Sequence, residues 1–345
     1  MSSEQGPNAT RPAGAPAPVV EEGVLELPGD FALHLGGSLR AVRVGWRLEG
    51  APGAPVVAAL GGISAHRRIY SLEDRRAGWW PELAGPGLPL DACRYRLLGI
   101  DFLGGSGATT GPSPGQLDFP AIDARDQARL IACVADHLGL AGLHAIAGAS
   151  YGGMVALAFG ELFPHRVGRL LVISGAHRTN PLATAWRSVQ REAVRFGVAR
   201  GDGAGGLRLA RALAMATYRT RAEFTGRFGN SPRLEAGRAT FPVEEYLFAR
   251  GDDYAARYRP ESFLCLSQSI DLQRVDPARV RVPAVLVAVV EDQLVTLEDM
   301  RELDATLAGP HRLFEIGSHF GHDAFLKERA QLAPAFALAL DGDLR

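Results

Sequence analysis

The pentapeptide Gly-Ala-Ser-Tyr-Gly at 148–152 constrains the fold of this chain more than any other feature. It lies between an apolar run over 143–147, typical of a buried strand, and a helical pattern over 151–163 that ends at Pro164. A serine with a glycine two residues away on either side fits the sharp strand-to-helix turn that exposes a nucleophile, because a side chain at either glycine would collide with the adjoining strand and helix. The alternative is a tight turn that carries a solvated serine. The flanking elements favour a nucleophile at Ser150.

Strands and helices alternate on both sides of this turn. Apolar or alternating runs predict strands, and apolar residues at helical spacing predict helices. The predicted strands cover 39–48, 55–60, 94–100, 143–147, 169–173, 284–290 and 312–316, and the predicted helices cover 123–138, 151–163, 297–307 and a final stretch from Asp323. This order is typical of a mostly parallel sheet with helices on both faces.

The alternation stops after His177 and resumes after Asp276. The segment between them contains helical patterns over 183–196 and 207–218 and lacks an apolar, strand-like run. An insertion of this kind is expected over the carboxyl ends of the strands, where open α/β sheets bind their ligands. The predicted parts are a disordered tail over 1–22, an α/β catalytic domain over 23–177 and 277–345, and a helical lid insertion over 178–276.

The charge balance and the lysine content exclude several classes of function. Acidic and basic residues nearly cancel, at 38 and 37, so we expect neither a nucleic acid nor a membrane as partner. All but one of the basic residues are arginine, and the single lysine, Lys327, lies in a charged stretch that reads as helical. Lysine-dependent phosphate loops and Schiff-base chemistry are therefore not expected.

The use of cysteine and histidine predicts a cytoplasmic protein without a metal. Cys93, Cys133 and Cys265 are far apart and odd in number, which predicts neither a disulfide framework nor a Cys-x-x-Cys site. The first residues lack the basic and apolar pattern of a signal peptide. A His-Glu-x-x-His pair is also lacking, so a metal hydrolase is not expected.

A serine hydroxyl needs a base to become a nucleophile, and the base needs a carboxylate to orient it. With a nucleophile on a strand-to-helix turn of this type, the usual chain order is Ser, then Asp or Glu, then His, and the last two follow late strands. Asp292 and His322 each follow one of the last two predicted strands. Glu291 and His319 are alternatives at neighbouring positions. We expect Ser150, Asp292 and His322 to form a catalytic triad.

Acyl transfer also needs amide donors for the oxyanion. One is expected at Tyr151, directly after the nucleophile, and the other at Gly61, in the loop after the predicted strand 55–60. The pair of glycines in that loop lets the backbone approach a substrate closely. A simple glycine turn is the alternative.

Short motifs from about 55 to 332 follow one another in a fixed order. They are W-W-P at 79–81, G-P-G at 85–87, L-G-G at 103–105, T-G-P-S at 110–113, G-A-S-Y-G-G-M at 148–154, R-F-G at 227–229, V-E-E-Y-L at 243–247, G-D at 251–252, S-F-L at 262–264 and G-H-D-A-F-L at 321–326. In these motifs the chain resembles the homoserine O-acyltransferases of the α/β-hydrolase type. The resemblance implies the α/β-hydrolase fold and a ping-pong transfer of succinyl or acetyl from coenzyme A to the hydroxyl of L-homoserine, in methionine biosynthesis.

The resemblance also implies roles for individual residues. Ser150, Asp292 and His322 would be the triad, and acyl-coenzyme A would be a co-substrate, so no cofactor is expected. Arg227 and Asp323 would hold the carboxylate and the ammonium group of the acceptor. For Arg227 the alternative is an ordinary surface arginine, and for Asp323 it is an acid that stabilises a helix N-terminus. The resemblance further implies a homodimer built through the helical insertion.

Departures from the acetyl-transferring members of this family favour succinyl as the acyl group. Tyr151 stands where those members usually carry Leu or Met, and 60–64 differs from their Leu-Thr-Gly loop. The start of the insertion, 177–187, resembles the succinyl-using branch. A succinyl donor carries an extra carboxylate, which Arg178 or Arg187 would bind. Transfer to L-serine in cysteine biosynthesis, a serine esterase or other hydrolase, and a binding module without activity are the alternatives.

Overall fold

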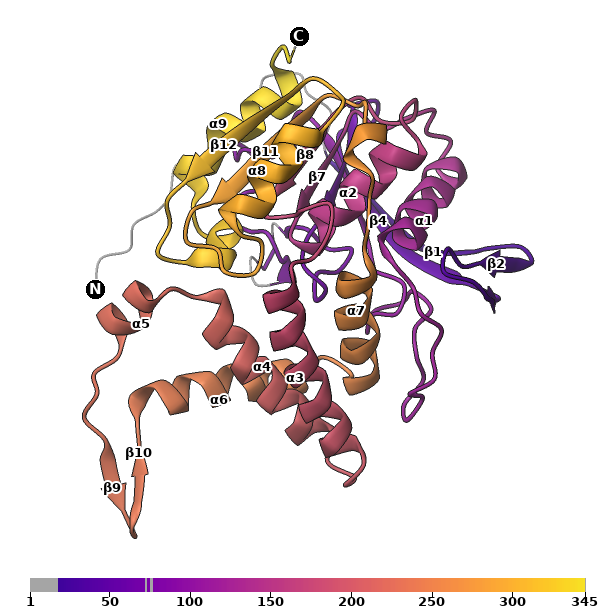
Figure 1. The fold of residues 1–345 in the computed structure, drawn as a ribbon. Coiled ribbons are helices and arrows are strands. Elements are labelled where there is room, and N and C mark those ends of the chain that lie inside the picture. The colour runs from indigo at the N-terminus through magenta and orange to yellow at the C-terminus, as the bar shows by residue number, and fades with distance from the viewer. Residues whose placement is uncertain (1–17, 72, 75–76, 345) are drawn as a thin grey trace.

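An eight-stranded sheet forms the centre of the computed structural model, which describes residues 18–71, 73–74 and 77–344 (Figure 1). In sheet order the strands are β1 (Val19–Glu26), β4 (Arg43–Gly50), β6 (Arg96–Ile100), β5 (Val56–Leu60), β7 (Ala145–Ala149), β8 (Leu170–Ile173), β11 (Ala284–Val289) and β12 (His311–Ile316). The strands from β6 to β12 run parallel, and β1 and β4 are antiparallel to their neighbours. The predicted α/β architecture with a mostly parallel sheet is confirmed.

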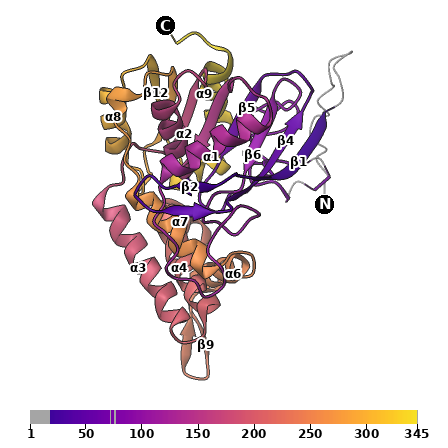
Figure 2. The ribbon, with the colours of Figure 1, turned by 90° about the vertical axis from the view of Figure 1, so that its right-hand side faces the viewer.

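The central strands are buried on both faces, which explains why they read as continuous apolar runs. In β5, Val56, Ala58 and Leu60 belong to one core, and Val57 and Ala59 belong to the other. Helices α1 (Ala124–His137), α2 (Tyr151–Leu162) and α8 (Leu297–Thr306) cover the first face, and α9 (Arg329–Asp341) covers the second. Figure 2 shows these helices flanking the sheet. The parallel strands therefore direct their carboxyl ends to one common edge.

The N-terminal strand corrects one prediction. Residues 19–22, assigned from the sequence to a disordered tail, form the first half of β1 and pair with β4. The pairing is stabilised by charge, because the Glu22 carboxylate lies 2.8 Å from both Arg47 and Arg67. The rest of the predicted tail, up to 17, lies outside the described residues. A short hairpin of β2 (Asp30–Ala32) and β3 (Ser38–Arg40) follows β1.

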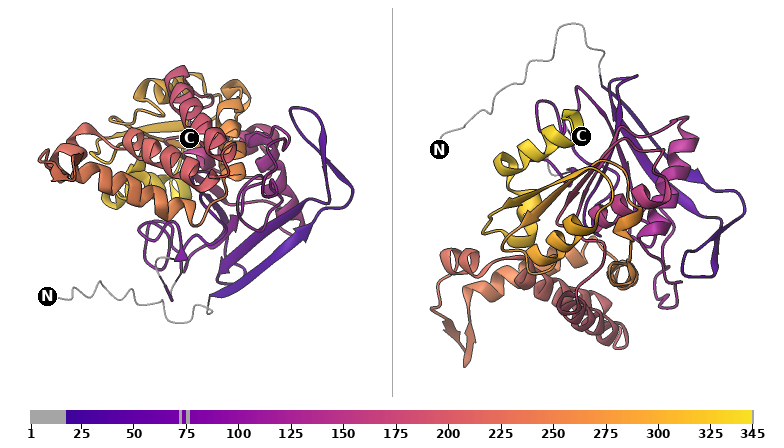
Figure 3. Two further views of the ribbon diagram at one scale, coloured as in Figure 1. Left: turned by 90° about the horizontal axis from the view of Figure 1, so that it is seen from below. Right: turned by 45° about the horizontal axis from the view of Figure 1, so that its top comes forward.

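A mainly helical segment separates β8 from β11. It contains α3 (Pro181–Val198), α4 (Gly203–Tyr218), α5 (Arg221–Arg227), β9 (Arg233–Glu235), β10 (Arg238–Thr240), α6 (Pro242–Ala255) and α7 (Pro260–Leu272). Helix α3 is capped by the Asn180 side chain, which accepts from the Ala183 amide, and α3 packs tightly on α4. The view from below in Figure 3 shows these helices across one end of the sheet. The domain boundaries at 178 and 276 stay predictions.

Helix α5, the β9–β10 hairpin and part of α6 extend away from the body of the molecule, and we call them the arm (Figure 1). None of the residues of α5 is buried, and Leu234 on β9 is 74% exposed. Among the helices that the structure describes, none combines the length and the apolar character needed to span a bilayer.

The end of the chain differs from the predicted single helix that starts at Asp323. A 3₁₀ helix, Gly321–Leu326, comes first, and α9 begins only at Arg329. The break falls at Lys327, whose φ of −129° is not helical. Lys327 therefore ends the 3₁₀ helix instead of lying inside a longer one.

Candidate active site

The turn between β7 and α2 holds Ser150 in a left-handed backbone conformation, with φ of 55°. The flanking glycines are required by close contacts. A Cβ on Gly148 would lie 2.1 Å from the carbonyl oxygen of Gly152, and a Cβ on Gly152 would lie 2.2 Å from the carbonyl oxygen of Leu60. The turn thus fits against β5 only without these side chains, and it presents Ser150 at the carboxyl edge of the sheet.

The structure brings Ser150, His322 and Asp292 into one hydrogen-bonded line. His322 Nε2 lies 2.8 Å from Ser150 Oγ, and His322 Nδ1 lies 2.7 Å from Asp292 Oδ2. The other oxygen of Asp292 accepts from the amides of Leu294 and Val295, at 2.8 and 3.1 Å. An imidazole that donates from Nδ1 to Asp292 keeps Nε2 as the acceptor for the serine proton.

The two alternative residues lie elsewhere. The Glu291 carboxylate is exposed and accepts from the Ser318 amide at 2.7 Å. The His319 ring is exposed and lies at a tilt against the Phe320 ring, with 4.1 Å between the ring centroids. The geometry therefore favours Asp292 and His322 over their neighbours.

The pKa of His322 results from opposing influences. Burial lowers it, whereas the charge of Asp292 and the hydrogen bond to it, together with the charge of Asp323, raise it. The raising influences prevail, so the pKa of His322 lies above its usual value. The ring is therefore a stronger base than an ordinary histidine.

The 3₁₀ helix that carries His322 and Asp323 is anchored by a buried tryptophan of the same core. The indole of the buried Trp80 donates from Nε1 to the carbonyl oxygen of Phe325 at 2.8 Å. The Trp80 ring also packs edge-to-face on Phe336 of α9. The W-W-P motif of the sequence thus positions the 3₁₀ helix that carries His322.

Ser150 lines two spaces, and a third adjoins one of them. The inner cavity, about 150 Å³, is lined by Ser150, His322, Asp323 and Arg211, among others. The side pocket, about 40 Å³, is lined by Ser150, His322, Arg178 and Arg187. The outer cavity, about 400 Å³, shares Ile63, Ser64, Ala65, Trp79 and Arg211 with the inner cavity.

Tyr151 contributes only its backbone to this site. Its side chain is fully buried, its hydroxyl lies 2.6 Å from Ser269 Oγ, and its ring meets Phe102 edge-to-face. The amide of Tyr151 begins α2, where helix N-termini favour negative charge. The Gly61 carbonyl accepts from Gly152 at 2.9 Å. The oxyanion role of the Gly61 and Tyr151 amides stays a prediction.

Arg227 does not reach the nucleophile. It ends α5 in the arm, its side chain is 48% exposed, and it pairs with Glu223 at 3.4 Å. Its guanidinium lies 4.2 Å above the Tyr246 ring. Arg227 lines none of the three spaces, because the arm leads the chain away from the sheet at this point.

Arg219, and not Arg227, contacts Asp323, although neither arginine lines the three spaces. The Arg219 side chain is 11% exposed, its Nε lies 2.8 Å from Asp323, and its NH1 lies 2.9 Å from Glu223. Asp323 itself is buried, lines the inner cavity and lies in the first turn of the 3₁₀ helix, so its position fits both the substrate contact and the helix acid. The signal for Arg219 in the sequence is its place directly after the predicted helical pattern over 207–218.

The two arginines expected to bind the succinyl carboxylate both line the side pocket. Arg178 is half-exposed and is held by both carboxylate oxygens of Glu302 at 2.7 Å. Arg187 is buried and pairs with Asp271 at 2.7 Å, and Arg191 pairs with the same carboxylate at 2.6 Å. Two guanidiniums against one carboxylate leave this buried cluster with a net charge of +1. Among the described residues, no group of three or more His, Cys, Asp and Glu side chains is placed to hold a metal ion.

Comparisons with known proteins agree with this geometry. The family model described as "alpha/beta hydrolase fold" matches residues 71–328. The chain is 44% identical to a homoserine O-succinyltransferase of Xanthomonas campestris pv. campestris, over 94% of this chain and 85% of that protein. It is 33% identical to a serine O-succinyltransferase of Litchfieldella anticariensis, over 91% and 96%. The crystal structure of a homoserine O-acetyltransferase from Bacillus anthracis superposes with a TM-score of 0.84 at 18% identity, over 95% and 99%, and shares the fold.

Proposed function

The chain belongs to the homoserine O-acyltransferase family of α/β-hydrolases, and on that premise we propose that it transfers an acyl group from acyl-coenzyme A to the hydroxyl of L-homoserine in methionine biosynthesis. The observation that carries the proposal is the aligned Ser150, His322 and Asp292 beside Asp323, a carboxylate suited to an ammonium group. Acyl-coenzyme A is a co-substrate in this scheme.

In the first half of the reaction Ser150 Oγ attacks the thioester carbonyl while His322 Nε2 takes the hydroxyl proton. The oxyanion of the tetrahedral intermediate accepts from the amides of Tyr151 and Gly61. When the intermediate collapses, the carbon–sulfur bond breaks and His322 gives its proton to the departing thiolate. The products are coenzyme A and an ester of Ser150.

In the second half the acceptor hydroxyl attacks this ester while His322 takes its proton. The second tetrahedral intermediate collapses, Ser150 receives the proton, and the O-acyl amino acid leaves. Asp323 binds the acceptor ammonium group. Arg219 orients Asp323, because its Nε donates to Asp323 and its NH1 donates to Glu223.

The acyl group that best fits the side pocket is succinyl. The cluster of Arg187, Arg191 and Asp271 carries a surplus positive charge in a buried place. A buried cation of this kind is stabilised by an anionic group, and the distal carboxylate of succinyl supplies one. The small volume of the side pocket suits a short acyl chain and not the coenzyme.

Replacement of Arg187 with glutamine is expected to change donor selectivity. The ratio of kcat/KM for succinyl-coenzyme A to that for acetyl-coenzyme A should fall by about 10-fold or more, the loss expected for a charged hydrogen bond. Asp271 keeps Arg191 as partner in this variant, so the cluster retains its carboxylate pairing. Steady-state rates with the two donors measure the effect. Arg178→Gln is the comparison. If this ratio fell in Arg178→Gln and not in Arg187→Gln, Arg178 would be the residue that contacts the succinyl carboxylate.

The acyl acceptor and donor are tested by product mass. Succinyl- and acetyl-coenzyme A are each incubated with the enzyme and L-homoserine or L-serine, and we expect O-succinylhomoserine as the main product. Serine is the second candidate acceptor, since a relative that covers most of this chain is a serine O-succinyltransferase. Thioester hydrolysis that exceeds transfer at saturating homoserine would make the protein a hydrolase instead.

We further propose that the enzyme is a homodimer formed through the helical segment. The arm exposes apolar side chains, with Leu234 at 74% and Phe241 at 38% exposure. A second copy of the chain would cover this surface. Light scattering is expected to give twice the chain mass at micromolar concentration, and a monomer there would contradict the assembly.

The cytoplasm is the proposed compartment. Cys133 and Cys265 are thiols in the structure, as expected in a reducing environment. Burial raises the pKa of Cys265 to about 12 and that of Cys133 in the same direction, so both are weak nucleophiles.

A further inference from the structure

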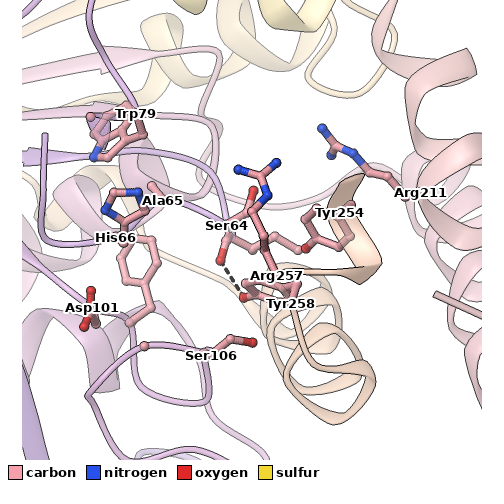
Figure 4. Close-up of a pocket in the computed structure, with 15 residues that line it drawn as sticks. Ser64, Ala65, His66, Trp79, Asp101, Ser106, Arg211, Tyr254, Arg257 and Tyr258 are labelled. Carbon is pink, nitrogen blue, oxygen red and sulfur yellow. Dashed lines mark hydrogen bonds between the residues drawn. The ribbon is translucent and has the colours of Figure 1, made fainter. Parts of the chain in front are cut away.

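The outer cavity is lined by side chains that have no role in the mechanism above. Figure 4 shows Arg211, Tyr254, Arg257 and Tyr258 on one side of it and His66, Trp79 and Asp101 on the other. The volume of about 400 Å³ exceeds that of the inner cavity and the side pocket. An amino acid and a short acyl group leave this space empty.

The charged side chains that line the outer cavity carry more positive than negative charge. Arg257 donates from Nε to the carbonyl oxygen of Asp253 at 3.0 Å, and Arg211 lies 4.9 Å above the ring of Tyr254. Within the described part of the chain, neither guanidinium forms an ion pair with a carboxylate. Both guanidiniums line the outer cavity, so their positive charges face a ligand that enters it.

Asp101, an acidic residue that lines the outer cavity, already has an arginine as its partner. The Asp101 carboxylate accepts from the amides of Arg67 and Ala108, at 2.8 Å each, and is paired with the Arg67 guanidinium. Burial lowers the pKa of His66, and Arg257 is among the neighbouring arginines that act in the same direction. A neutral His66 leaves the positive charge of the cavity to Arg211 and Arg257.

The outer cavity adjoins the inner cavity, which Ser150 lines. The segment 63–65, Trp79 and Arg211 line both the outer and the inner cavity, and Ser150 lines the inner one. In acyl-coenzyme A the reacting thioester is at one end of a long, uncharged pantetheine arm, and the diphosphate is at the other. A donor with its thioester at Ser150 therefore extends through the inner cavity into the outer one.

We infer that the outer cavity binds the diphosphate of the acyl-coenzyme A donor and that Arg257 and Arg211 are its cationic contacts. The inference rests on the proposed function, which supplies the donor. A guanidinium forms paired hydrogen bonds with phosphate oxygens, and in a chain with a single lysine the arginines must supply such contacts. Arg257 lines only the outer cavity, so it is the residue whose loss separates diphosphate binding from catalysis.

The test compares succinyl-coenzyme A with succinyl-pantetheine, which carries the same thioester and arm without the diphosphate and nucleotide. The wild type should prefer succinyl-coenzyme A in kcat/KM by about 10-fold or more, as expected for charged hydrogen bonds. Arg257→Gln should lose most of this preference through a higher KM for succinyl-coenzyme A. Arg257→Lys should retain part of it, because lysine still offers a positive charge to phosphate. Arg200→Gln, which removes an exposed arginine at the far end of α3, is the matched control and should keep the preference.

The possible outcomes separate the inference from the function. Equal kcat/KM for the two donors in the wild type would overturn the inference without the need for any variant. A loss in Arg257→Gln that is the same for both donors would also overturn it, because such a loss reflects a general structural defect. If the wild type transferred an acyl group from none of succinyl-coenzyme A, succinyl-pantetheine and acetyl-coenzyme A, the proposed function would instead be refuted.

Discussion

Replacement of Ser150 with alanine should lower the turnover number for acyl transfer by a factor of about 10⁶, the effect expected when the nucleophile of such a triad is lost. His322 then has no hydroxyl to activate, and the acyl group has no oxygen on which to reside between donor and acceptor. Intact-protein mass spectrometry after mixing with succinyl-coenzyme A alone should detect one added succinyl group on the wild type. The variant should show none.

The control for this experiment is Ser38→Ala, which removes an exposed serine hydroxyl from β3, a strand that contributes to none of the three spaces around Ser150. This variant should form the adduct and turn over like the wild type. An adduct or sustained transfer in Ser150→Ala would refute the serine mechanism, whatever the products are.

The second large effect is expected from Asp292→Asn, which should lower kcat by a factor of about 10⁴. The amide cannot stabilise the imidazolium that forms during each half-reaction, and it can present its N–H to Nδ1, which reverses the tautomer. Leu294 and Val295 can still donate to the side-chain oxygen of the new residue, so the loop should keep its shape.

The pH dependence of the same variant has a defined sign. In the wild type the pKa of His322 lies above its usual value, and the base acts only when neutral, so kcat/KM should fall as the pH drops through that raised pKa. Removal of the Asp292 charge leaves burial and Arg187 to lower the pKa, with Asp323 alone opposing them. The inflection in the pH profile should therefore move to lower pH.

Glu291→Gln provides the matched control, because this neighbouring carboxylate bonds the Ser318 amide and not the histidine. Its pH profile should coincide with that of the wild type. An inflection that moves with Glu291, or one that stays fixed in Asp292→Asn, would show that Asp292 does not set the basicity of His322.

The central sheet and the contacts of His322 with Ser150 and Asp292 were predictable from patterns in the sequence. A buried strand, a glycine-spaced serine and a helix adjoin in the chain around Ser150, so their geometry is local. Asp292 and His322 are distant in sequence, but each follows a strand of a parallel sheet, and such strand ends meet at one edge. The fold therefore brings them together without detailed knowledge of side chains.

The choice between Arg219 and Arg227 could not be made in this way. The two residues lie eight positions apart, Arg219 before the short helix α5 and Arg227 at its last position. The direction in which α5 leaves α4 decides which of them meets Asp323. That direction depends on tertiary contacts, among them the hydrogen bond from the Thr220 hydroxyl to the His319 carbonyl at 2.6 Å. No pattern near Arg219 in the sequence encodes the position of His319.

Ion pairing was equally hidden from the sequence. In the sequence, Arg178 and Arg187 were equivalent candidates to bind a carboxylate. In the structure Arg178 pairs with Glu302, whereas Arg187 shares Asp271 with Arg191. Each partner comes from a different part of the chain. The charge available to a substrate depends on these partners and not on the arginine itself.

The left-handed backbone of Ser150 means that this chain does not have the most stable sequence available to its own fold. A residue with a side chain in that conformation costs on the order of 1–3 kcal/mol, and glycine would avoid most of this strain. The surroundings enforce the conformation, since Gly152 is pressed against the Leu60 carbonyl. Activity and stability therefore compete at a single position, and the working enzyme keeps the less stable of the two choices.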